Sequence, residues 1–301
     1  MQSHAASAAP QPSPRKTLRF RHFFVRAMLG PRHSSSDECY ASMTNDPDVR
    51  IDPKGLYTNM GWWGDGAGDV TSACEALLAR VARWARIDEA ETLLDVGFGT
   101  GGPLVFWGRA SGARIWGVNR SQDQTAVATT LVRNDVAGDR IFPTRGDASA
   151  LAFPAESFDA VLAVEAAFHF ATRESFFQEA WRVLRPGGRL VMTDIVPSSE
   201  YRGLARLCWW IFDRFVHAPA ANRVTAEALR IQLEELGFKV ELDVRTQETI
   251  TGFFRWGSHG FGEPLARIAC GVIARLFAAR PPVECVFVRA TKPRTVPSRG
   301  V

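Results

Sequence analysis

Segments with the pattern of buried strands alternate with helix-like segments between about residues 90 and 190. The expected strands are short apolar runs, and they cover residues 91–98, 113–119, 140–147, 158–166 and 189–196. Ser121 is the expected N-cap of one intervening helix, and a second helix is expected to begin at Thr172 and to stop at Pro186. Strand–helix–strand units with short connections favour right-handed crossovers and a parallel sheet. Two later strands, at 239–245 and 284–292, complete the expected α/β fold, a doubly wound, mostly parallel seven-stranded sheet.

Charge is distributed unevenly along the 301 residues. The formal net charge is +4, but residues 1–36 carry six Lys or Arg without an acid, and residues 289–301 carry four more. The middle of the chain is therefore acidic, which does not favour a nucleic acid as partner. No apolar run approaches the ~20 residues of a membrane-spanning helix, so no stable membrane insertion is expected. The five cysteines are scattered without a CxxC pair, which indicates neither a disulfide framework nor a bound metal, and the reducing cytoplasm is the predicted location.

The first expected strand runs into a glycine-rich turn, LLDVGFGTGG, at residues 93–102. Gly97, Gly99 and Gly101 permit positive φ angles and allow a ligand to lie against the backbone. Turns of this kind lie at the carboxyl edge of a doubly wound sheet, where ligands bind. The G-x-G-x-G spacing differs from the G-x-G-x-x-G of dinucleotide-binding proteins, and the second strand ends in Asn119 instead of an acid. On its own, the loop indicates a nucleotide-like ligand.

Two further segments narrow the choice of ligand: GDASALAFPAESFDAVLAVEAAFHF (146–170) and EAWRVLRPGGRLVMTDIVP (179–197). Together with the glycine loop, they resemble the motifs of class I S-adenosylmethionine-dependent methyltransferases, in the same order. The resemblance implies S-adenosyl-L-methionine as cofactor, with its adenine at Asp147 and Ala148. It implies that the methionine and ribose portion binds at the loop, which contains Asp95, Gly97, Gly99 and Gly101. Asn119 lies where most members carry an acid that binds the ribose hydroxyls, and an amide binds a diol with weaker hydrogen bonds.

A closer resemblance covers about residues 18 to 195 and returns in the short segment VRATKP. The segments GLYTNMGWW (55–63) and EAAFHFATRESFFQEAWRVLRPGG look like parts of natural-product O-methyltransferases, in the erythromycin-type group that acts on macrolide sugars. In relatives the aromatic segment folds over the cofactor, which implies this role for Tyr57, Trp62 and Trp63. Packing of an N-terminal helix onto the sheet is the alternative for these aromatic side chains.

Composition and the resemblance together divide the chain into expected regions. We expect a disordered tail (1–17), a helical cover over cofactor and substrate (18–90), a methyltransferase domain (91–292) and a basic tail (293–301). Within the domain, helical cap segments are expected at about 198–235 and 250–282, where little resembles the family and where relatives usually bind their acceptors. One of these helices, RLCWWIFDRF (206–215), is apolar nearly all round, so it is expected to form a buried lid, a dimer contact or ordinary core.

Methyl transfer to an alcohol requires alignment of the acceptor and removal of its proton. His169 follows the fourth strand at the ligand edge, and imidazole titrates near neutral pH, so it is the best candidate for the general base. A structural histidine in the core is the alternative, and His217 and His259 are weaker candidates. Glu165 ends the same strand and is predicted to contact the cofactor, to orient His169 or to cap nearby backbone. Gln124 is expected to reach the ribose or to complete a capping box.

Together these residues predict an enzyme that methylates a hydroxyl of a small, largely apolar metabolite, either alone or as a homodimer. A C-methyltransferase acting on a lipid, terpenoid or quinone-like acceptor would share the cofactor motifs and depend more on Glu165 than on His169. A protein or RNA methyltransferase is disfavoured by the acidic middle of the chain. A descendant that keeps the cofactor without methylating anything would also preserve the glycine loop, so a product assay is needed to distinguish it.

Overall fold

A computed structural model describes residues 52–198, 218–261, 264–279 and 281–294. Several expectations from the sequence lie outside these ranges: the disordered tail, the apolar helix at 206–215, His217 and the end of the basic tail. Within the described ranges, no helix is long and apolar enough to cross a membrane. The same residues contain no group of three or more His, Cys, Asp or Glu side chains that could hold a metal ion.

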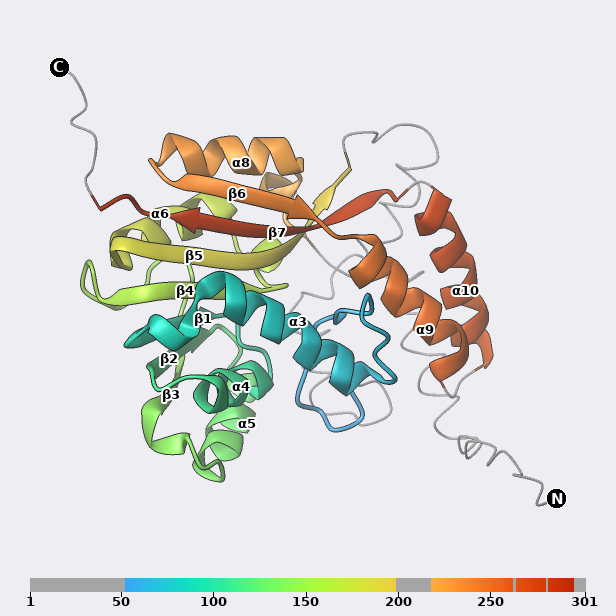
Figure 1. Ribbon diagram of the computed structural model, residues 1–301, viewed down its shortest axis with the longest axis horizontal. Coiled ribbons are helices and arrows are strands. Elements are labelled where there is room, and N and C mark those ends of the chain that lie inside the picture. The colour runs from blue at the N-terminus through green and yellow to red at the C-terminus, as the bar shows by residue number, and fades with distance from the viewer. Residues whose placement is uncertain (1–51, 199–217, 262–263, 280, 295–301) are drawn as a thin grey trace.

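Seven strands form a single sheet: β1 (Thr92–Val96), β2 (Arg114–Asn119), β3 (Ile141–Arg145), β4 (Phe158–Val164), β5 (Leu184–Pro197), β6 (Lys239–Val244) and β7 (Val283–Thr291). Their order across the sheet is β3-β2-β1-β4-β5-β7-β6 (Figure 1). Neighbours from β3 to β5 pair in parallel, whereas β7 lies antiparallel between β5 and β6. This topology confirms the predicted doubly wound, mostly parallel seven-stranded sheet.

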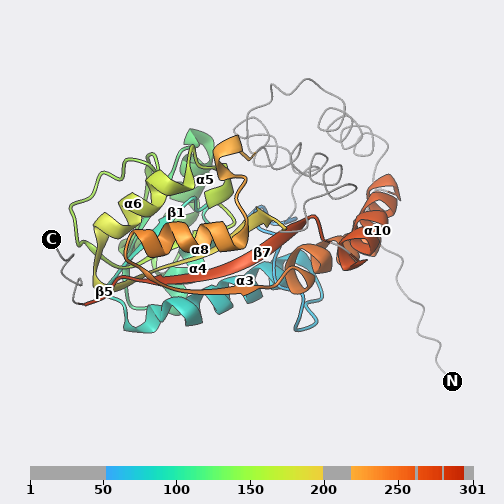
Figure 2. The ribbon, with the colours of Figure 1, turned by 90° about the horizontal axis from the view of Figure 1, so that it is seen from above.

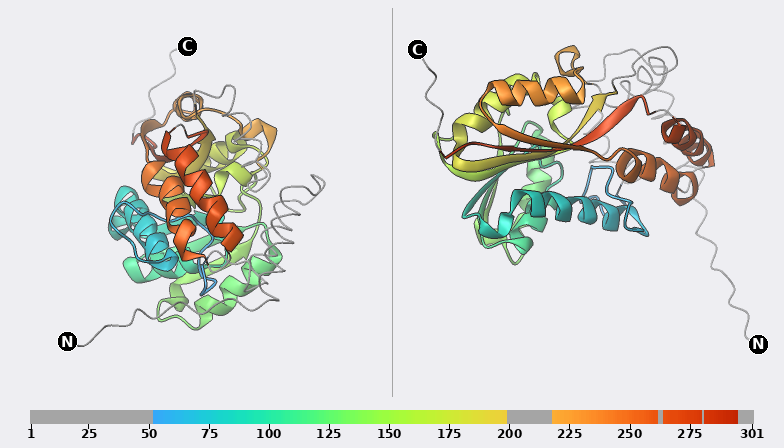
Figure 3. Two further views of the ribbon diagram at one scale, coloured as in Figure 1. Left: turned by 90° about the vertical axis from the view of Figure 1, so that its right-hand side faces the viewer. Right: turned by 45° about the horizontal axis from the view of Figure 1, so that its top comes forward.

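Helices cover both faces of the sheet (Figure 2). One face carries α3 (Val70–Ala85), α4 (Gly102–Ala110) and α5 (Gln122–Arg133), and the other carries α6 (Arg173–Val183) and α8 (Ala226–Glu235). The helices α9 (Gly252–Gly260) and α10 (Pro264–Ala279) lie beyond the carboxyl end of β6 (Figure 3). Single turns connect these elements: η1 (Ile87–Glu89), η2 (Gly138–Arg140), η3 (Ala167–His169), η4 (Ala220–Asn222) and the π-helical η5 (Gln247–Thr251).

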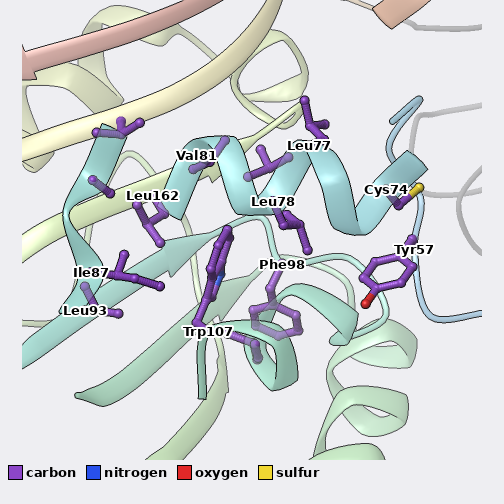
Figure 4. Packing of buried hydrophobic residues seen from close by; sticks show 14 of the residues in the cluster. Tyr57, Cys74, Leu77, Leu78, Val81, Ile87, Leu93, Phe98, Trp107 and Leu162 are labelled. Carbon is purple, nitrogen blue, oxygen red and sulfur yellow. The ribbon is translucent and has the colours of Figure 1, made fainter. Parts of the chain in front are cut away.

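Two hydrophobic clusters fill the space between the sheet and its helices. In β1, Leu93 belongs to the cluster under α3, α4 and α5, and Leu94 belongs to the cluster under α6 and α8. This alternation follows from the two-residue period of a strand. Figure 4 shows the first cluster, in which Leu78 of α3 lies above Trp107 and Phe98. Because β1 is buried on both faces, packing fixes the place from which the glycine loop leaves the sheet.

Two helix starts follow the capping signals of the sequence. The hydroxyl of Ser121 accepts a hydrogen bond from the backbone N–H of Gln124 at the start of α5. The hydroxyl of Thr172 accepts one from the backbone N–H of Ser175 at the start of α6. Each cap satisfies a backbone donor that has no partner inside its helix, so both predicted starts are confirmed.

The end of α6 differs from the prediction. The helix ends at Val183, three residues before the proline that was expected to end it, and Leu184 already begins β5. Leu184 is fully buried and pairs with Phe158 of β4. Sheet pairing therefore ends the helix before Pro186 can, and β5 is longer than the sequence pattern indicates.

Candidate active site

A cleft opens at the carboxyl ends of β1, β2 and β4, which is the edge where doubly wound sheets bind ligands. Its empty volume, with the open side included, is about 830 Å³. The structure brings most of the predicted site residues together on its walls. Those that line the cleft are Gly97, Gly99, Asn119, Gln124, Asp147, Ala148, Glu165 and His169.

Two of the three predicted glycines form the wall nearest β1. Gly97 has a φ of +87° and Gly99 a φ of +58°. A Cβ on Gly97 would lie 2.5 Å from the Cβ of Ala166, and a Cβ on Gly99 would lie 2.7 Å from Oγ1 of Thr58. A side chain therefore fits at neither position, and bare backbone faces the cleft. Gly101 lies behind this wall as the N-cap of α4.

Asp95 lies under the glycine loop and does not line the cleft. Its side chain is buried, and Oδ2 accepts a hydrogen bond of 2.7 Å from Nε1 of Trp107. Burial raises the pKa of Asp95 to about 7, and the hydrogen bond from Trp107 opposes this rise. The carboxyl group thus connects the end of β1 to α4 and supports the loop from inside.

Asn119 and Gln124 form the wall at the end of β2. Nδ2 of Asn119 donates to the carbonyl of Gly99 at 3.2 Å and to Oε1 of Gln124 at 2.9 Å. The amide of Gln124 is therefore directed toward Asn119. Its Nε2 is buried without a hydrogen-bond partner, which leaves a donor at the cleft for an oxygen of a ligand.

Asp147 and Ala148 follow β3 and line the same cleft. Oδ1 of Asp147 accepts hydrogen bonds from the backbone N–H of Ser149 at 2.8 Å and from its hydroxyl at 2.7 Å. These bonds hold the pKa of Asp147 below its usual value. The carboxylate is consequently ionised at neutral pH and can accept a hydrogen bond from an amino group.

Glu165 follows β4 and is 9% exposed. Its φ of +47° is unusual for a residue with a side chain, and the residue lines the cleft. Oε2 accepts a hydrogen bond of 2.9 Å from the backbone N–H of Met60, whereas Oε1 is buried without a hydrogen-bond partner. Burial raises the pKa of Glu165 to about 7. A cationic group bound beside Oε1 would favour the ionised form.

His169 ends the single turn η3 and lines the cleft in a half-buried position. Its backbone N–H donates to the carbonyl of Ala166 at 3.0 Å, and its ring centroid lies 4.1 Å from that of Phe168. The turn after β4 therefore places an imidazole in the same cleft as the glycine loop.

The aromatic segment before α3 packs beside the cleft. Tyr57 is buried and donates from its hydroxyl to a carboxylate of α3, and Nε1 of Trp63 donates to the carbonyl of Met60 at 2.8 Å. The ring of Trp63 also stacks on Trp256 of α9, with 5.4 Å between ring centroids. Thr58 is the residue of this segment that lines the cleft. Tyr57 and Trp63 hold the segment in place.

Sequence reasoning missed several residues on the cleft walls. The missed residues are Thr58, Arg120, Ala166 and Phe170. Each is the sequence neighbour of a predicted residue, and this adjacency was the available signal. The apolar pattern in the sequence locates the end of each strand, but it does not reveal which residue of the following loop faces the cleft.

Known proteins similar to this chain identify its family. Residues 94–192 match a family model described as a methyltransferase domain. The erythromycin 3''-O-methyltransferase of Saccharopolyspora erythraea is 34% identical over 231 residues, which are 75% of this chain and 74% of that protein. The chain belongs to the S-adenosylmethionine-dependent methyltransferases.

Other methyltransferases similar to it act on different atoms. The sterol 24-C-methyltransferase of Yarrowia lipolytica is 38% identical over 109 residues, which are 36% of this chain and 29% of that protein. The geranyl diphosphate C-methyltransferase of Streptomyces coelicolor A3(2), solved with Mg²⁺, geranyl diphosphate and S-adenosyl-L-homocysteine, has a TM-score of 0.65 at 17% identity. That comparison covers 87% of this chain and 99% of the other chain, and it confirms the Rossmann-like methyltransferase fold.

S-adenosyl-L-methionine is the cofactor of this methyltransferase, and the residues of the cleft fit it. Bare backbone at Gly97 and Gly99 permits close approach, and the partnerless amide of Gln124 suits a hydroxyl of a ribose. The buried Oε1 of Glu165 suits a cationic group, and the ionised carboxylate of Asp147 suits an amino group. The cleft therefore offers donors and acceptors that match the polar and cationic parts of this molecule.

Proposed function

We propose that this methyltransferase moves the methyl group of S-adenosyl-L-methionine to a hydroxyl of a small, largely apolar metabolite, with His169 as the general base. The observation that carries the proposal is that His169 lines the same cleft as the glycine loop. Bound cofactor supplies a methyl group on a positively charged sulfur, which a nucleophile can displace. An alcohol is a strong nucleophile only as its proton leaves, and a neutral imidazole accepts that proton near neutral pH.

In this proposal, different walls of the cleft bind different parts of the cofactor. The backbone of Gly97 and Gly99 would hold the methionine portion, Asn119 and Gln124 the ribose, and Asp147 with Ala148 the adenine. This assignment is supported by the position of all these residues in one cleft. The remaining predicted residues would support the binding site from behind, and they are Tyr57, Trp63, Asp95 and Gly101.

Glu165 would act on the cofactor electrostatically. One carboxylate oxygen holds the backbone of Met60, and the other would face a cationic group of the cofactor. Because burial raises the pKa of Glu165 to about 7, the bound cation would also draw the carboxyl group into its ionised form. Cofactor binding and the position of the segment around Met60 would therefore be linked through one side chain.

The proposed acceptor class is supported by a similar protein and by apolar side chains at the cleft. The similar protein from Saccharopolyspora erythraea is named for a methyl transfer to oxygen on erythromycin. In this chain the cleft walls also carry apolar side chains, Val96, Val118, Val164 and Phe170. Such side chains favour an apolar acceptor.

Methyl transfer to carbon is the second candidate, and Glu165 is the observation that favours it. A carbon nucleophile that attacks the methyl group must lose a proton from carbon afterwards, and a buried carboxylate with a pKa of about 7 can accept one. The similarity to a sterol 24-C-methyltransferase supports this alternative. Under it, loss of Glu165 would reduce turnover more than loss of His169.

Titration calorimetry followed by mass spectrometry tests the proposed function. We expect S-adenosyl-L-methionine and S-adenosyl-L-homocysteine to bind with micromolar Kd and NAD not to bind. Incubation with hydroxylated apolar metabolites should then yield a product heavier by one methylene group. Cofactor binding without any methylated product across O- and C-acceptors would instead indicate a descendant that uses the cofactor as scaffold.

The role of His169 requires its own comparison. His169→Ala should lower kcat by about 10²–10⁴-fold and leave the cofactor Kd within about twofold, because a general base acts on the acceptor. His259→Ala is the matched control, since His259 is exposed on α9 and does not line the cleft. Equal loss of activity in both variants would contradict the proposed base.

A further inference from the structure

A residue far along the chain holds the turn that carries His169. Asn222 ends η4 and is 2% exposed. Its Nδ2 donates to the carbonyl of Phe170 at 2.7 Å and to the carbonyl of Phe168 at 3.3 Å. These carbonyls belong to the residues on either side of His169, so one amide group is hydrogen-bonded to the backbone both before and after the proposed base.

The other atoms of Asn222 are fixed to the start of α6. Its Oδ1 accepts a hydrogen bond of 2.8 Å from the backbone N–H of Arg173, the first residue of that helix. This N–H has no partner inside the helix, so the amide oxygen serves as a cap. The guanidinium group of Arg173 in turn donates to the backbone carbonyl of Asn222.

Arg173 connects this assembly to the sheet. The guanidinium is 2% exposed and its Nε lies 2.6 Å from Oδ2 of Asp194, which is fully buried in β5. Another of its nitrogens donates to the carbonyl of Ile195 at 2.9 Å. The contacts therefore run from β5 through Arg173 and Asn222 to the turn around His169.

We propose that Asn222 is the positioning residue for His169, fixing the η3 turn so that the imidazole faces the acceptor side of the cleft. The proposal rests on the proposed function in its assignment of His169 as the base. Asn222 does not line the cleft, so it acts through His169 and not on a ligand. The hydrogen bond to Phe168 is buried and the one to Phe170 is partly buried, so breaking them would leave carbonyl groups of the turn poorly satisfied.

Loss of the amide donors leaves two carbonyls of the turn without their partner. The turn then relaxes toward other hydrogen bonds, and the imidazole moves with it. Because a displacement of about 1 Å in a reacting group can reduce a rate by about 10²-fold, we expect kcat to fall by about 10- to 100-fold. The Kd for S-adenosyl-L-homocysteine should stay within about twofold, because the side-chain hydrogen bonds of Asn222 run to the η3 turn and to α6 instead of the glycine loop or the β2 wall.

Two variants remove the donors in different ways. Asn222→Asp keeps the oxygen that caps α6 and replaces the donor to Phe168 and Phe170 by a negatively charged acceptor. Asn222→Ala removes the whole amide and introduces no charge. Thr246→Val is the matched control, because Thr246 is likewise buried and its hydroxyl accepts a hydrogen bond from the backbone N–H of Cys285 in β7, outside the η3 turn and α6.

The decisive measurement is the NMR spectrum of the histidine imidazole groups, recorded on the full chain saturated with S-adenosyl-L-homocysteine. The sequence has six histidines, and the His169 resonance is assigned as the one lost in His169→Gln. In both Asn222 variants this resonance should shift or broaden while that of His259 stays, and Thr246→Val should change neither. An unchanged His169 resonance in Asn222→Ala and Asn222→Asp overturns the proposal, whatever the acceptor is.

Turnover provides a second test once an acceptor is known. Asn222→Asp should lower kcat by about 10- to 100-fold in the wild type and by less than about twofold in a His169→Ala background, because a positioning residue has no effect once its target is gone. Losses that multiply in the double variant would overturn the proposal. If His169→Ala alone keeps full turnover, the proposed base fails, and the spectrum still shows whether Asn222 positions the imidazole.

Discussion

Replacing the buried Asp95 by asparagine should make the stability of the protein less dependent on pH. The carboxyl group lies under the glycine loop, with Trp107 as its donor, and burial raises its pKa from 3.8 to about 7. In the unfolded chain the group loses its proton above about pH 4, whereas in the folded chain it keeps the proton until about pH 7. A raised pKa in an acid thus contributes stability that is fully present below pH 4 and is lost by about pH 7.

The size of this effect follows from the two pKa values. Each pH unit between them is equivalent to about 1.4 kcal/mol, so the whole interval corresponds to about 4 kcal/mol. Between pH 5 and pH 8, only the two units up to pH 7 contribute. The wild type should therefore lose about 3 kcal/mol of unfolding free energy relative to Asp95→Asn over that range. Asparagine keeps an oxygen that accepts from Trp107 and has no proton to release.

Urea unfolding of both proteins at pH 5, 6, 7 and 8 measures the difference directly. Asp139→Asn is the control for the change in net charge, because Asp139 is exposed in η2. Glu165 also has a pKa raised to about 7, but it is present in all three proteins and cancels in the comparison. Parallel curves for wild type and Asp95→Asn would refute the reasoning, because they would show that the ionised carboxylate is tolerated in the core without cost.

Three further substitutions test other parts of the site. Asp194→Ala should lower the unfolding free energy by about 3–5 kcal/mol in urea, because it leaves the buried guanidinium of Arg173 without its partner; a loss under about 1 kcal/mol would contradict this. Gly99→Val should abolish S-adenosyl-L-methionine binding in calorimetry, since a Cβ already lies 2.7 Å from Oγ1 of Thr58, and an unchanged Kd would place the cofactor elsewhere. Glu165→Gln should raise the Kd for S-adenosyl-L-methionine about tenfold at pH 8 and much less at pH 6, where the wild-type carboxyl group is itself largely protonated. The same ratio of variant to wild-type Kd at both pH values would count against an electrostatic role.

The fold and the edge of the sheet that carries the site follow from local patterns in the sequence. Apolar runs locate β1 to β5, and Gly97 and Gly99 mark a turn that only glycine fills comfortably. The direction of each side chain depends on packing that no local pattern records. Asp95 turns inward because Trp107 of α4 presents its N–H there, and Tyr57 turns inward toward a carboxylate of α3.

Long-range hydrogen bonds were the least predictable part of the site. Asn222 lies in a segment without recognisable family motifs, and its bonds reach residues about fifty positions earlier in the chain. The sequence contains no periodicity or spacing that links such positions. The same is true of Met60, whose backbone N–H holds Glu165 across more than a hundred residues.

These long-range contacts also bear on how related enzymes could share one set of motifs and methylate different atoms. The segment that matches the methyltransferase family model, residues 94–192, contains both Glu165 and His169. Groups outside it contact the Glu165 carboxylate and the backbone around His169: Met60 before the segment and Asn222 after it. Changes in the flanking regions can therefore move the proposed base relative to the carboxylate without altering any cofactor motif. The cofactor can thus be inferred from the matched segment, whereas the position of the proposed base depends also on residues outside that segment.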